Sequence, residues 1–280
     1  MKNGVVYFMV KISILITNDD GIYAEGIQVL SQKIFEIYGR QMEISIVAPN
    51  HEQSAVGHAI TMHRPLRVEP IRYLHNPALA GWSVNGTPSD CVKLAVESLL
   101  PEKPSLVISG INQGSNLGTD ILYSGTVSAA VEGIILGIPS IAISLINPDE
   151  SGFDFSAEFA CHLIPLLIET GLPPGTLLNI NVPPGTCEKI KGVCVTRLGD
   201  RRYRNTFQKR TDPRGKHYYW LAGDVIETQN EKEFDVGATK EGYISVTPIH
   251  FDLTRYDLFE TLQKTIDRID LFVKNDCTDI

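Results

Sequence analysis

Residues 11–21 of the chain read KISILITNDDG, and this stretch decides the fold. Residues 11–17 are mostly apolar and β-branched, which is typical of a strand buried on both faces of a sheet. The strand runs into a polar turn at 18–21. Apolar residues then recur at helical spacing over 27–37, and Gly39 is a natural residue to end that helix. A buried strand, a turn and an amphipathic helix in this order indicate the first unit of an α/β sheet.

The same alternation continues along the first half of the chain. Further strands are predicted at 42–48, 105–109 and 139–145, and helices at 87–100 and 126–136. The first of these helices opens with TPSD, which supplies a capping threonine, a proline in the first turn and an aspartate three residues on. Strands that alternate with helices pair in parallel through right-handed crossovers. We therefore predict an α/β fold with a mostly parallel sheet.

Beyond residue 150 the pattern changes toward strands and hairpins. The predicted elements are a helix at 157–170, strands at 176–182, 190–198 and 243–251, and an amphipathic helix near 255–274. We expect residues 1–198 to form the core, with the strand at 243–251 as a candidate member of its sheet. Residues 199–280 are expected to form a hairpin extension and the C-terminal helix, without being an independent domain.

Composition excludes several classes of protein. Lysine and arginine number 25 against 33 aspartates and glutamates, and the net charge of −8 is opposite in sign to that of a protein that coats nucleic acid. The five cysteines include no Cys-x-x-Cys pair, which argues against a disulfide scaffold or a thiolate zinc site and fits a reducing cytoplasm. No apolar run reaches membrane-spanning length. We expect a soluble cytoplasmic protein that binds neither a membrane nor a nucleic-acid polymer.

Polar loops follow three of the predicted strands. They lie at 18–21 (NDDG), 49–54 (PNHEQS) and 109–118 (SGINQGSNLG). In a parallel sheet, ligands bind beyond the carboxyl ends of the strands, so these three loops should meet at one edge. An acidic protein that handles phosphate must neutralise it locally, with a metal ion or with backbone amides. The expected convergence of the loops is the strongest functional signal that the residues themselves provide.

Asp19 and Asp20 are adjacent carboxylates, and two like charges so close cost energy unless a cation or a proton intervenes. The same residues suit a solvated turn, but their place after a buried strand favours a metal site. Asn112 offers an amide oxygen, although an Asx-turn explains it equally well, and Ser54 is recommended only by its place after a strand. Such oxygen ligands favour Mg²⁺, Mn²⁺ or Ca²⁺ over structural zinc.

The segment Tyr123-Ser124-Gly125-Thr126 precedes the helix predicted at 126–136. Free N–H groups and the positive dipole end of a helix suit a phosphate group, and the two hydroxyl side chains add donors. An ordinary Ser/Thr helix cap explains the same residues. Three common motifs are absent from the sequence: the dinucleotide Gly-x-Gly-x-x-Gly after the first strand, the P-loop, and the Gly-x-Ser-x-Gly elbow of hydrolases.

A basic segment spans 200–216. Its seven basic residues are Arg201, Arg202, Arg204, Lys209, Arg210, Arg214 and Lys216. Tyr203 and Phe207 are interleaved with them. Such a segment can touch a phosphorylated substrate or a neighbouring subunit, but a solvated hairpin is the preferred interpretation. Of the histidines, only His51 and His58 fall near the predicted site, where either can carry a proton, although a loop histidine is more often just solvated.

The sequence resembles the SurE (survival protein E) family of metal-dependent 5′-nucleotidases. The resemblance spans most of the chain, in the family's order. The matching stretches are 14–21 (ILITNDDG), 47–49 (VAP) with Ser54, 85–90 (NGTPSD), 107–112 (VISGIN), 116–118 (NLG), 123–133 (YSGTVSAAVEG), 213–220 (PRGKHYYW) and 242–248 (GYISVTP). Each piece alone is weak, but the combination is highly specific.

The resemblance implies a Rossmann-like three-layer sandwich, with a protruding hairpin and a C-terminal element that serves oligomerisation as a homodimer or homotetramer. It implies hydrolysis of nucleoside 5′- and often 3′-monophosphates, and sometimes of short polyphosphate, with one divalent cation, Mg²⁺ or Mn²⁺. The chain departs from the family in the residues before Met9 and over 227–239.

The resemblance also assigns roles to single residues. The family's metal ligands fall on Asp19, Asp20, Ser54 and Asn112, and its catalytic residues on Asp19, Asp20 and Asn112. Its phosphate-binding residues fall on Asn116, Ser124, Gly125 and Thr126.

Two mechanisms fit these residues. In one, the cation lowers the pKa of the attacking water and neutralises charge that develops on phosphorus. In the other, Asp19 or Asp20 attacks phosphorus as a covalent nucleophile. Two functions without turnover remain as alternatives: a module that only binds nucleotide or metal, and an assembly protein that uses its hairpin and C-terminal helix as interfaces.

Overall fold

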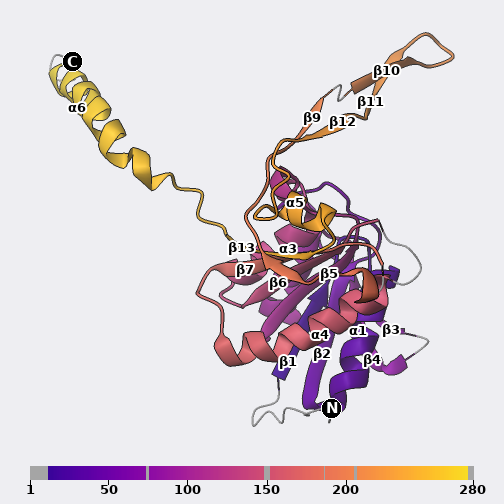
Figure 1. Ribbon diagram of the computed structural model, residues 1–280. Helices are drawn as coiled ribbons and strands as arrows, with labels where there is room; N and C mark the ends of the chain where they lie inside the picture. Colours follow the sequence, from indigo (N-terminus) through magenta and orange to yellow (C-terminus); the bar gives the residue numbers. More distant parts are fainter. Residues whose placement is uncertain (1–11, 74–75, 148–151, 186, 205–206, 277–280) are drawn as a thin grey trace. The chain divides into compact units, whose positions relative to one another are not determined.

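The computed structural model describes residues 12–73, 76–147, 152–185, 187–204 and 207–276 (Figure 1). Its centre is a nine-stranded sheet with the order β3-β4-β2-β1-β5-β6-β7-β13-β8. The strands of this sheet are β1 (Ile12–Thr17), β2 (Met42–Pro49), β3 (Val68–Tyr73), β4 (Asn76–Val84), β5 (Leu106–Gln113), β6 (Ser140–Leu145), β7 (Thr176–Val182), β8 (Val193–Val195) and β13 (Ile244–His250).

Most neighbouring strands of the sheet run parallel. β4, β2, β1, β5, β6 and β7 all pair in parallel, in that order. β3 pairs antiparallel with β4 at one edge, and β13 lies antiparallel to β7 but parallel to β8. The predicted α/β fold with a mostly parallel sheet is therefore confirmed. The carboxyl ends of β1, β2 and β5 consequently lie along the same edge of the sheet.

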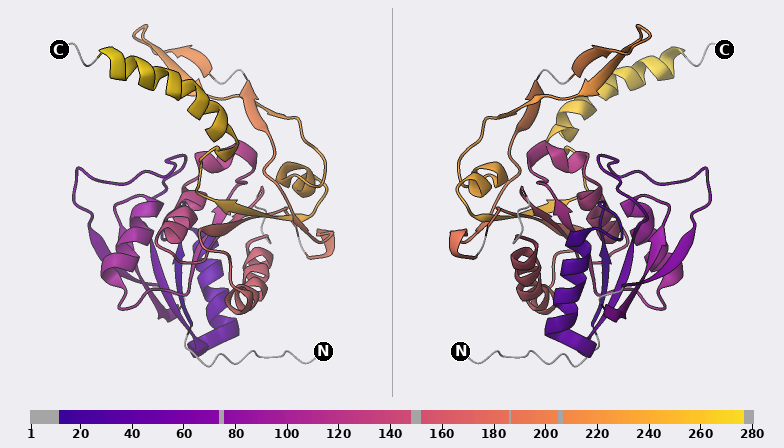
Figure 2. Two further views of the ribbon diagram at one scale, coloured as in Figure 1. Left: turned by 90° about the vertical axis from the view of Figure 1, so that its left-hand side faces the viewer. Right: turned by 90° about the vertical axis from the view of Figure 1, so that its right-hand side faces the viewer.

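Helices cover both faces of the sheet (Figure 2). The helices of the unit that contains the sheet are α1 (Glu25–Tyr38), α2 (Pro88–Leu94), α3 (Gly125–Ile135), α4 (Gly152–Thr170) and α5 (Asp235–Lys240), and a further helix, α6 (Phe259–Asp276), belongs to a separate unit of the chain. Ile14 and Ile16 of β1 pack into the core shared with α1 and α4, whereas Leu15 packs into the core shared with α2 and α3. All three side chains are fully buried, which explains why β1 is apolar on both faces. The sheet and the helices on its two faces therefore form a three-layer sandwich.

The pair β3–β4 is not predicted from the sequence. Pro70 and Gly81 interrupt its apolar pattern and resemble the breakers found in loops. Gly81 is nevertheless part of the sheet, because a Cβ atom there would lie 2.4 Å from the carbonyl oxygen of Ile46 on the neighbouring strand. The glycine permits a close approach of two backbones rather than a turn.

Other boundaries also differ from the sequence expectation. The strand expected at 190–198 is reduced to the three residues of β8. α4 begins at Gly152 rather than at residue 157, with Ser156 Oγ donating to the carbonyl of Gly152. α5 lies between the basic segment and β13, where no helix or strand is predicted from the sequence. Its six residues are too few to show a helical period.

The basic segment forms exposed strands. β9 (Arg201–Arg204) pairs with β12 (Asp224–Glu227), and β10 (Phe207–Thr211) pairs with β11 (His217–Leu221), both antiparallel. The chain divides into two compact units, one ending at His250 and the other, which contains α6, beginning at Phe251. Among the helices of the described residues, none has the length and apolar character needed to cross a membrane.

Candidate active site

The three polar loops that follow β1, β2 and β5 line one cavity of about 480 Å³. The short helix Gly118–Leu122 and the start of α3 complete its wall. The lining residues are Asp19, Asp20, Glu52, Ser54, Ala55, Asn112, Gln113, Asn116, Asp120, Tyr123 and Ser124. The cavity lies beyond the carboxyl ends of the strands, where the sheet topology places ligands.

Asp19 is held firmly at the base of the cavity. Its side chain is only 7% exposed, and the hydroxyl of Thr126 donates to its Oδ1 atom. Gly125 packs directly against it, because a Cβ atom at residue 125 would lie 2.8 Å from the Asp19 Cβ atom. Burial raises the pKa of Asp19, and the hydrogen bonds from Thr126 offset part of that rise. The first turn of α3 thus fixes the position of this carboxylate.

Asp20 lies closer to solvent than Asp19. Its Oδ2 atom accepts a hydrogen bond of 3.0 Å from the backbone N–H of Gln113, which ties the loop after β1 to the last residue of β5. Burial raises the pKa of Asp20 to about 6; the Gln113 hydrogen bond lowers it, and the charges of Asp19 and Glu52 raise it further. The carboxylate pair therefore carries an unfavourable charge density that a cation would relieve.

Ser54 and Asn112 supply the neutral oxygen atoms of the site. The hydroxyl of Ser54 donates its proton to Glu52, which leaves the oxygen lone pairs for another partner. The amide nitrogen of Asn112 donates to the carbonyl of Gly114 at 2.8 Å, so its Oδ1 atom is the remaining acceptor. The described residues contain no group of three or more His, Cys, Asp or Glu side chains able to hold a metal. A mixed set of carboxylate, hydroxyl and amide oxygens fits Mg²⁺ or Mn²⁺.

The expected phosphate-binding residues divide into two groups. Asn116 and Ser124 line the cavity, whereas Gly125 and Thr126 do not and instead contact Asp19. Ser124 is the N-cap of α3, since its side chain accepts a hydrogen bond from the N–H of Val127 at 3.1 Å. The side chain of Thr126 is fully buried and already donates its proton. The sequence predicts that a helix begins here, but it does not reveal that the first residues of this helix support Asp19.

Asn116 is held by its backbone as well as by its side chain. Its N–H donates to Asn181 Oδ1 at 2.8 Å, and its carbonyl accepts from the side-chain amides of both Asn179 and Asn181. Its own side-chain nitrogen donates to Ser144 Oγ at 2.8 Å. Asn179 and Asn181 are fully buried side chains of β7. The position of Asn116 in the cavity wall is therefore determined by buried side chains of β6 and β7.

Five cavity residues receive no role from the sequence: Glu52, Ala55, Gln113, Asp120 and Tyr123. Glu52 and Gln113 lie in the loops that were expected to converge, and Ala55 directly follows one of these loops. Asp120 and Tyr123 precede Ser124 on the same chain segment. Their positions in these loops are the signal that could have identified them. Neither loop histidine lines the cavity; His51 bonds to Gln53, and His58 bonds to the buried Glu132 at 2.8 Å.

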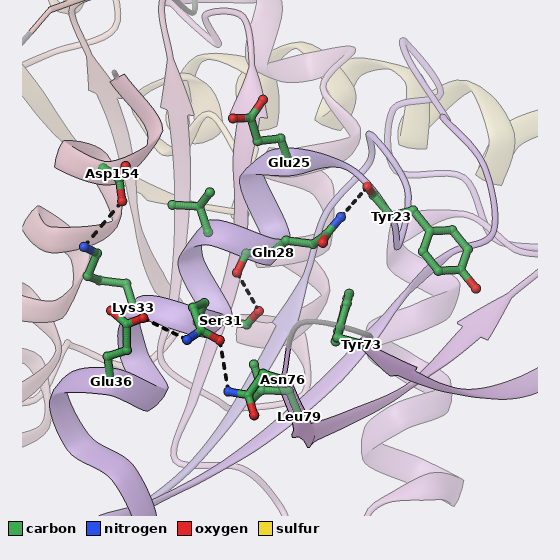
Figure 3. Close-up of a pocket in the computed structure, with 12 residues that line it drawn as sticks. Tyr23, Glu25, Gln28, Ser31, Lys33, Glu36, Tyr73, Asn76, Leu79 and Asp154 are labelled. Atoms are coloured by element: carbon green, nitrogen blue, oxygen red, sulfur yellow. Dashed lines mark hydrogen bonds and ion pairs between the residues drawn. The ribbon is translucent and has the colours of Figure 1, made fainter. Parts of the chain in front are cut away.

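A second pocket of about 370 Å³ lies along α1 near the start of β4 (Figure 3). Its polar side chains pair with one another. Asn76 donates to Gln32 at 2.9 Å, and Lys33 lies 3.4 Å from Asp154. These contacts connect the first residue of β4 to α1, and α1 to α4. Several polar groups of this pocket are thus paired with one another, and we assign the chemistry to the cavity that contains Asp19 and Asp20.

The raised pKa of Asp20 predicts a pH effect on stability. A carboxyl group whose pKa is higher in the folded state than in the unfolded chain favours folding when protonated, so its contribution is lost as pH rises from its usual 3.8 to about 6. Without divalent cations, we therefore expect Asp20→Asn to gain stability over the parent chain across this pH range. Thermal unfolding in EDTA measures the difference. The exposed Glu102→Gln variant is the control, and equal profiles for Asp20→Asn and the parent would contradict the prediction.

Comparisons with known proteins agree with this architecture. Residues 14–205 match the family model described as survival protein SurE. The 5′-nucleotidase SurE of Pelotomaculum thermopropionicum is 57% identical over 254 residues, which cover 90% of this chain and 95% of the relative. The 5′-nucleotidase SurE of Heliobacterium modesticaldum is 54% identical over 247 residues, covering 88% of this chain and 89% of the relative.

The fold agrees with that of a solved relative. The crystal structure of the SurE protein from Aquifex aeolicus superposes with a TM-score of 0.77 at 39% sequence identity. The match covers 90% of this chain and 99% of that one. The family model covers the three loops of the cavity, the relatives and the solved structure match about nine tenths of the chain, and the chain therefore belongs to the SurE family.

Proposed function

We propose that the chain hydrolyses nucleoside 5′-monophosphates to nucleoside and inorganic phosphate, and that it also accepts 3′-monophosphates and short polyphosphates. The observation that carries this proposal is the single cavity in which the Asp19–Asp20 pair faces the capped start of α3. The relatives also support it, because two proteins named 5′-nucleotidase SurE share more than half of their aligned residues with this chain over most of its length.

The proposal includes one divalent cation, Mg²⁺ or Mn²⁺. Asp19, Asp20, Ser54 and Asn112 would hold it, and all four line the cavity. When bound, the cation supplies Lewis-acid stabilisation of the charge that develops on phosphorus. The hydrogen bonds to Thr126, Gln113, Glu52 and Gly114 leave each ligand in a fixed orientation. Each proposed ligand is therefore oriented by a partner within the protein.

The remaining residues position the phosphate group. Asn116 and Ser124 lie in the cavity wall and present amide and hydroxyl groups to it. Gly125 and Thr126 act through Asp19, one by close packing and the other by its hydrogen bond. Phosphoryl transfer requires mostly positioning and charge stabilisation, so such a sparse set of groups suffices.

The proposal extends to assembly and location. Leu262 and Ile266 of α6, and Phe207 and Leu221 on the β10–β11 hairpin, are at least half exposed. Exposed apolar side chains of this size favour association, and we propose a homodimer or homotetramer in the cytoplasm.

Phosphate release from a panel of nucleoside 5′- and 3′-monophosphates tests the proposed activity. We expect release with Mg²⁺ or Mn²⁺ and a loss of at least about a hundredfold in EDTA, because the carboxylate pair alone would repel a phosphate dianion. Cation binding is measured in parallel by calorimetry. Tight nucleotide binding without phosphate release in the presence of either cation would contradict the proposed activity and favour a nucleotide-binding module. A stable oligomer that binds neither ligand would favour an assembly protein.

A further inference from the structure

Arg201 differs from the rest of the basic segment. Its side chain is 16% exposed, whereas that of the adjacent Arg202 is 74% exposed and pairs with its near neighbour Asp200. The other described members of the segment lie on exposed strands or their turn. A nearly buried guanidinium at the root of a solvated hairpin requires partners of its own.

One partner of Arg201, Asp120, lines the cavity, and the others lie on the same segment 115–120 or on β12. Its Nη1 atom lies 3.0 Å from Asp120 Oδ2 and donates to Ser115 Oγ at 3.1 Å. Its Nε atom lies 3.3 Å from a carboxylate oxygen of Glu227 on β12. Its backbone carbonyl accepts a hydrogen bond from Thr119. The start of the hairpin is therefore bound to the segment 115–120 through both side chain and backbone.

A buried aspartate reinforces this connection. Asp235 is fully buried on α5, and it accepts hydrogen bonds of 2.8 Å from the backbone N–H groups of both Gly118 and Gly199. Gly118 has φ +53°, and a Cβ atom there would lie 2.5 Å from the carbonyl oxygen of Gly199. The two backbones can therefore approach only because residue 118 is glycine. The root of the hairpin cannot shift without moving the cavity wall.

Asp120 is the cavity residue to which Arg201 is joined. It lines the cavity, and the phenol of Tyr203 donates to the same Oδ2 atom at 2.7 Å. Its carbonyl accepts the N–H groups of Tyr123 and Ser124, so it also supports the start of α3. The cavity contains three further carboxylates, those of Asp19, Asp20 and Glu52. A fourth uncompensated negative charge would oppose the entry of a phosphate dianion.

We propose that Arg201 is a positioning residue for the nucleotidase reaction. It neutralises the carboxylate of Asp120 in the cavity wall, so that this residue can support the start of α3 through its backbone carbonyl without its side chain repelling the phosphate group of the substrate. This inference rests on the proposed function. It assigns to the hairpin root a part in substrate affinity, and it separates Arg201 from the solvated basic residues that follow it.

Arg201→Met tests the inference against the matched control Arg202→Met. We expect Arg201→Met to raise KM for a nucleoside 5′-monophosphate, and the inhibition constant of inorganic phosphate, about tenfold at low ionic strength. We expect kcat to change less than about twofold, because Arg201 touches no cation ligand, and the KM effect to shrink at high salt. Arg202→Met should match the parent chain, since its side chain is mostly exposed.

The double variant Arg201→Met/Asp120→Asn separates charge from scaffolding. Asparagine keeps an acceptor oxygen for Tyr203 but removes the negative charge, so KM should return to within about twofold of the parent value. A KM that stays high in the double variant, or that never rises in Arg201→Met, overturns the inference. If Arg201→Met does not fold, Asp120→Asn alone decides: KM should fall, and a rise overturns the inference. Absence of phosphate release from the parent chain would instead overturn the proposed function.

Discussion

Asp20→Asn is expected to lower metal-dependent kcat/KM by about a thousandfold or more. The substitution removes one of the two anionic ligands proposed for the cation, and the neutral amide of asparagine binds Mg²⁺ or Mn²⁺ far more weakly than a carboxylate does. The fold should persist, because the asparagine carbonyl oxygen can still accept the Gln113 N–H group. Initial rates over a range of cation concentrations measure the loss, and thermal unfolding establishes that the variant is folded.

Asp154→Asn is the matched control for this experiment. Asp154 is an exposed carboxylate of α4 that pairs with Lys33 at the second pocket. Its loss should leave both turnover and cation affinity unchanged, since an exposed ion pair contributes little. Calorimetry then separates a loss of cation binding from a loss of chemistry. Full metal-dependent activity in Asp20→Asn would remove Asp20 from the site.

Gly125→Ala is expected to lower kcat/KM about a hundredfold although it adds only a methyl group. That methyl would lie 2.8 Å from the Asp19 Cβ atom, 3.0 Å from its Oδ2 atom and 3.2 Å from Pro88 Cγ. Asp19 is buried and cannot turn away into solvent, so its carboxylate must shift. A displacement of a few tenths of an ångström would spoil the proposed cation ligand and weaken the hydrogen bond from Thr126. Cation affinity and steady-state rates measure the effect.

Gly133→Ala provides a control within the same helix. A Cβ atom there would lie 2.2 Å from Ser140 Oγ and 3.1 Å from Val107 Cγ2, so the crowding is as severe but lies two turns from the cavity. We expect Gly133→Ala to reduce thermal stability while the folded protein keeps its specific activity and cation affinity. If both variants lose stability and activity in proportion, the effect of Gly125→Ala is general and not a displacement of Asp19.

The sequence predicts the centre of this fold well for a physical reason. β1 is buried on both faces, and its sequence is accordingly a nearly continuous apolar run. The start of α2 is predicted by a capping box, in which the side chains of Thr87 and Asp90 accept hydrogen bonds from each other's backbone N–H groups. Both signals depend on residues that are close together in the sequence, so they can be recognised without the structure. The expected convergence of three loops follows from parallel pairing alone, because adjacent parallel strands present their carboxyl ends to the same side.

What the sequence does not reveal depends on contacts between distant segments. The hydrogen bond from Thr126 to Asp19 joins residues more than a hundred positions apart, and nothing in the local pattern distinguishes it from an ordinary helix start. The local sequence likewise does not reveal the ion pair between Asp120 and Arg201, because this pair depends on the path of the hairpin root. Such pairs decide which polar residues face the cavity and which support it from behind.

The position of β13 has a consequence for how the chain is made. β13 is the last strand of the sheet in the sequence, yet it lies between β7 and β8. A nascent chain on the ribosome therefore exposes the edge of β7 until residue 250 has emerged, long after all three cavity loops have been synthesised. Asp235, which fixes Gly118, also arrives late. A message truncated before β13 would yield every cavity residue but an open strand edge prone to aggregation.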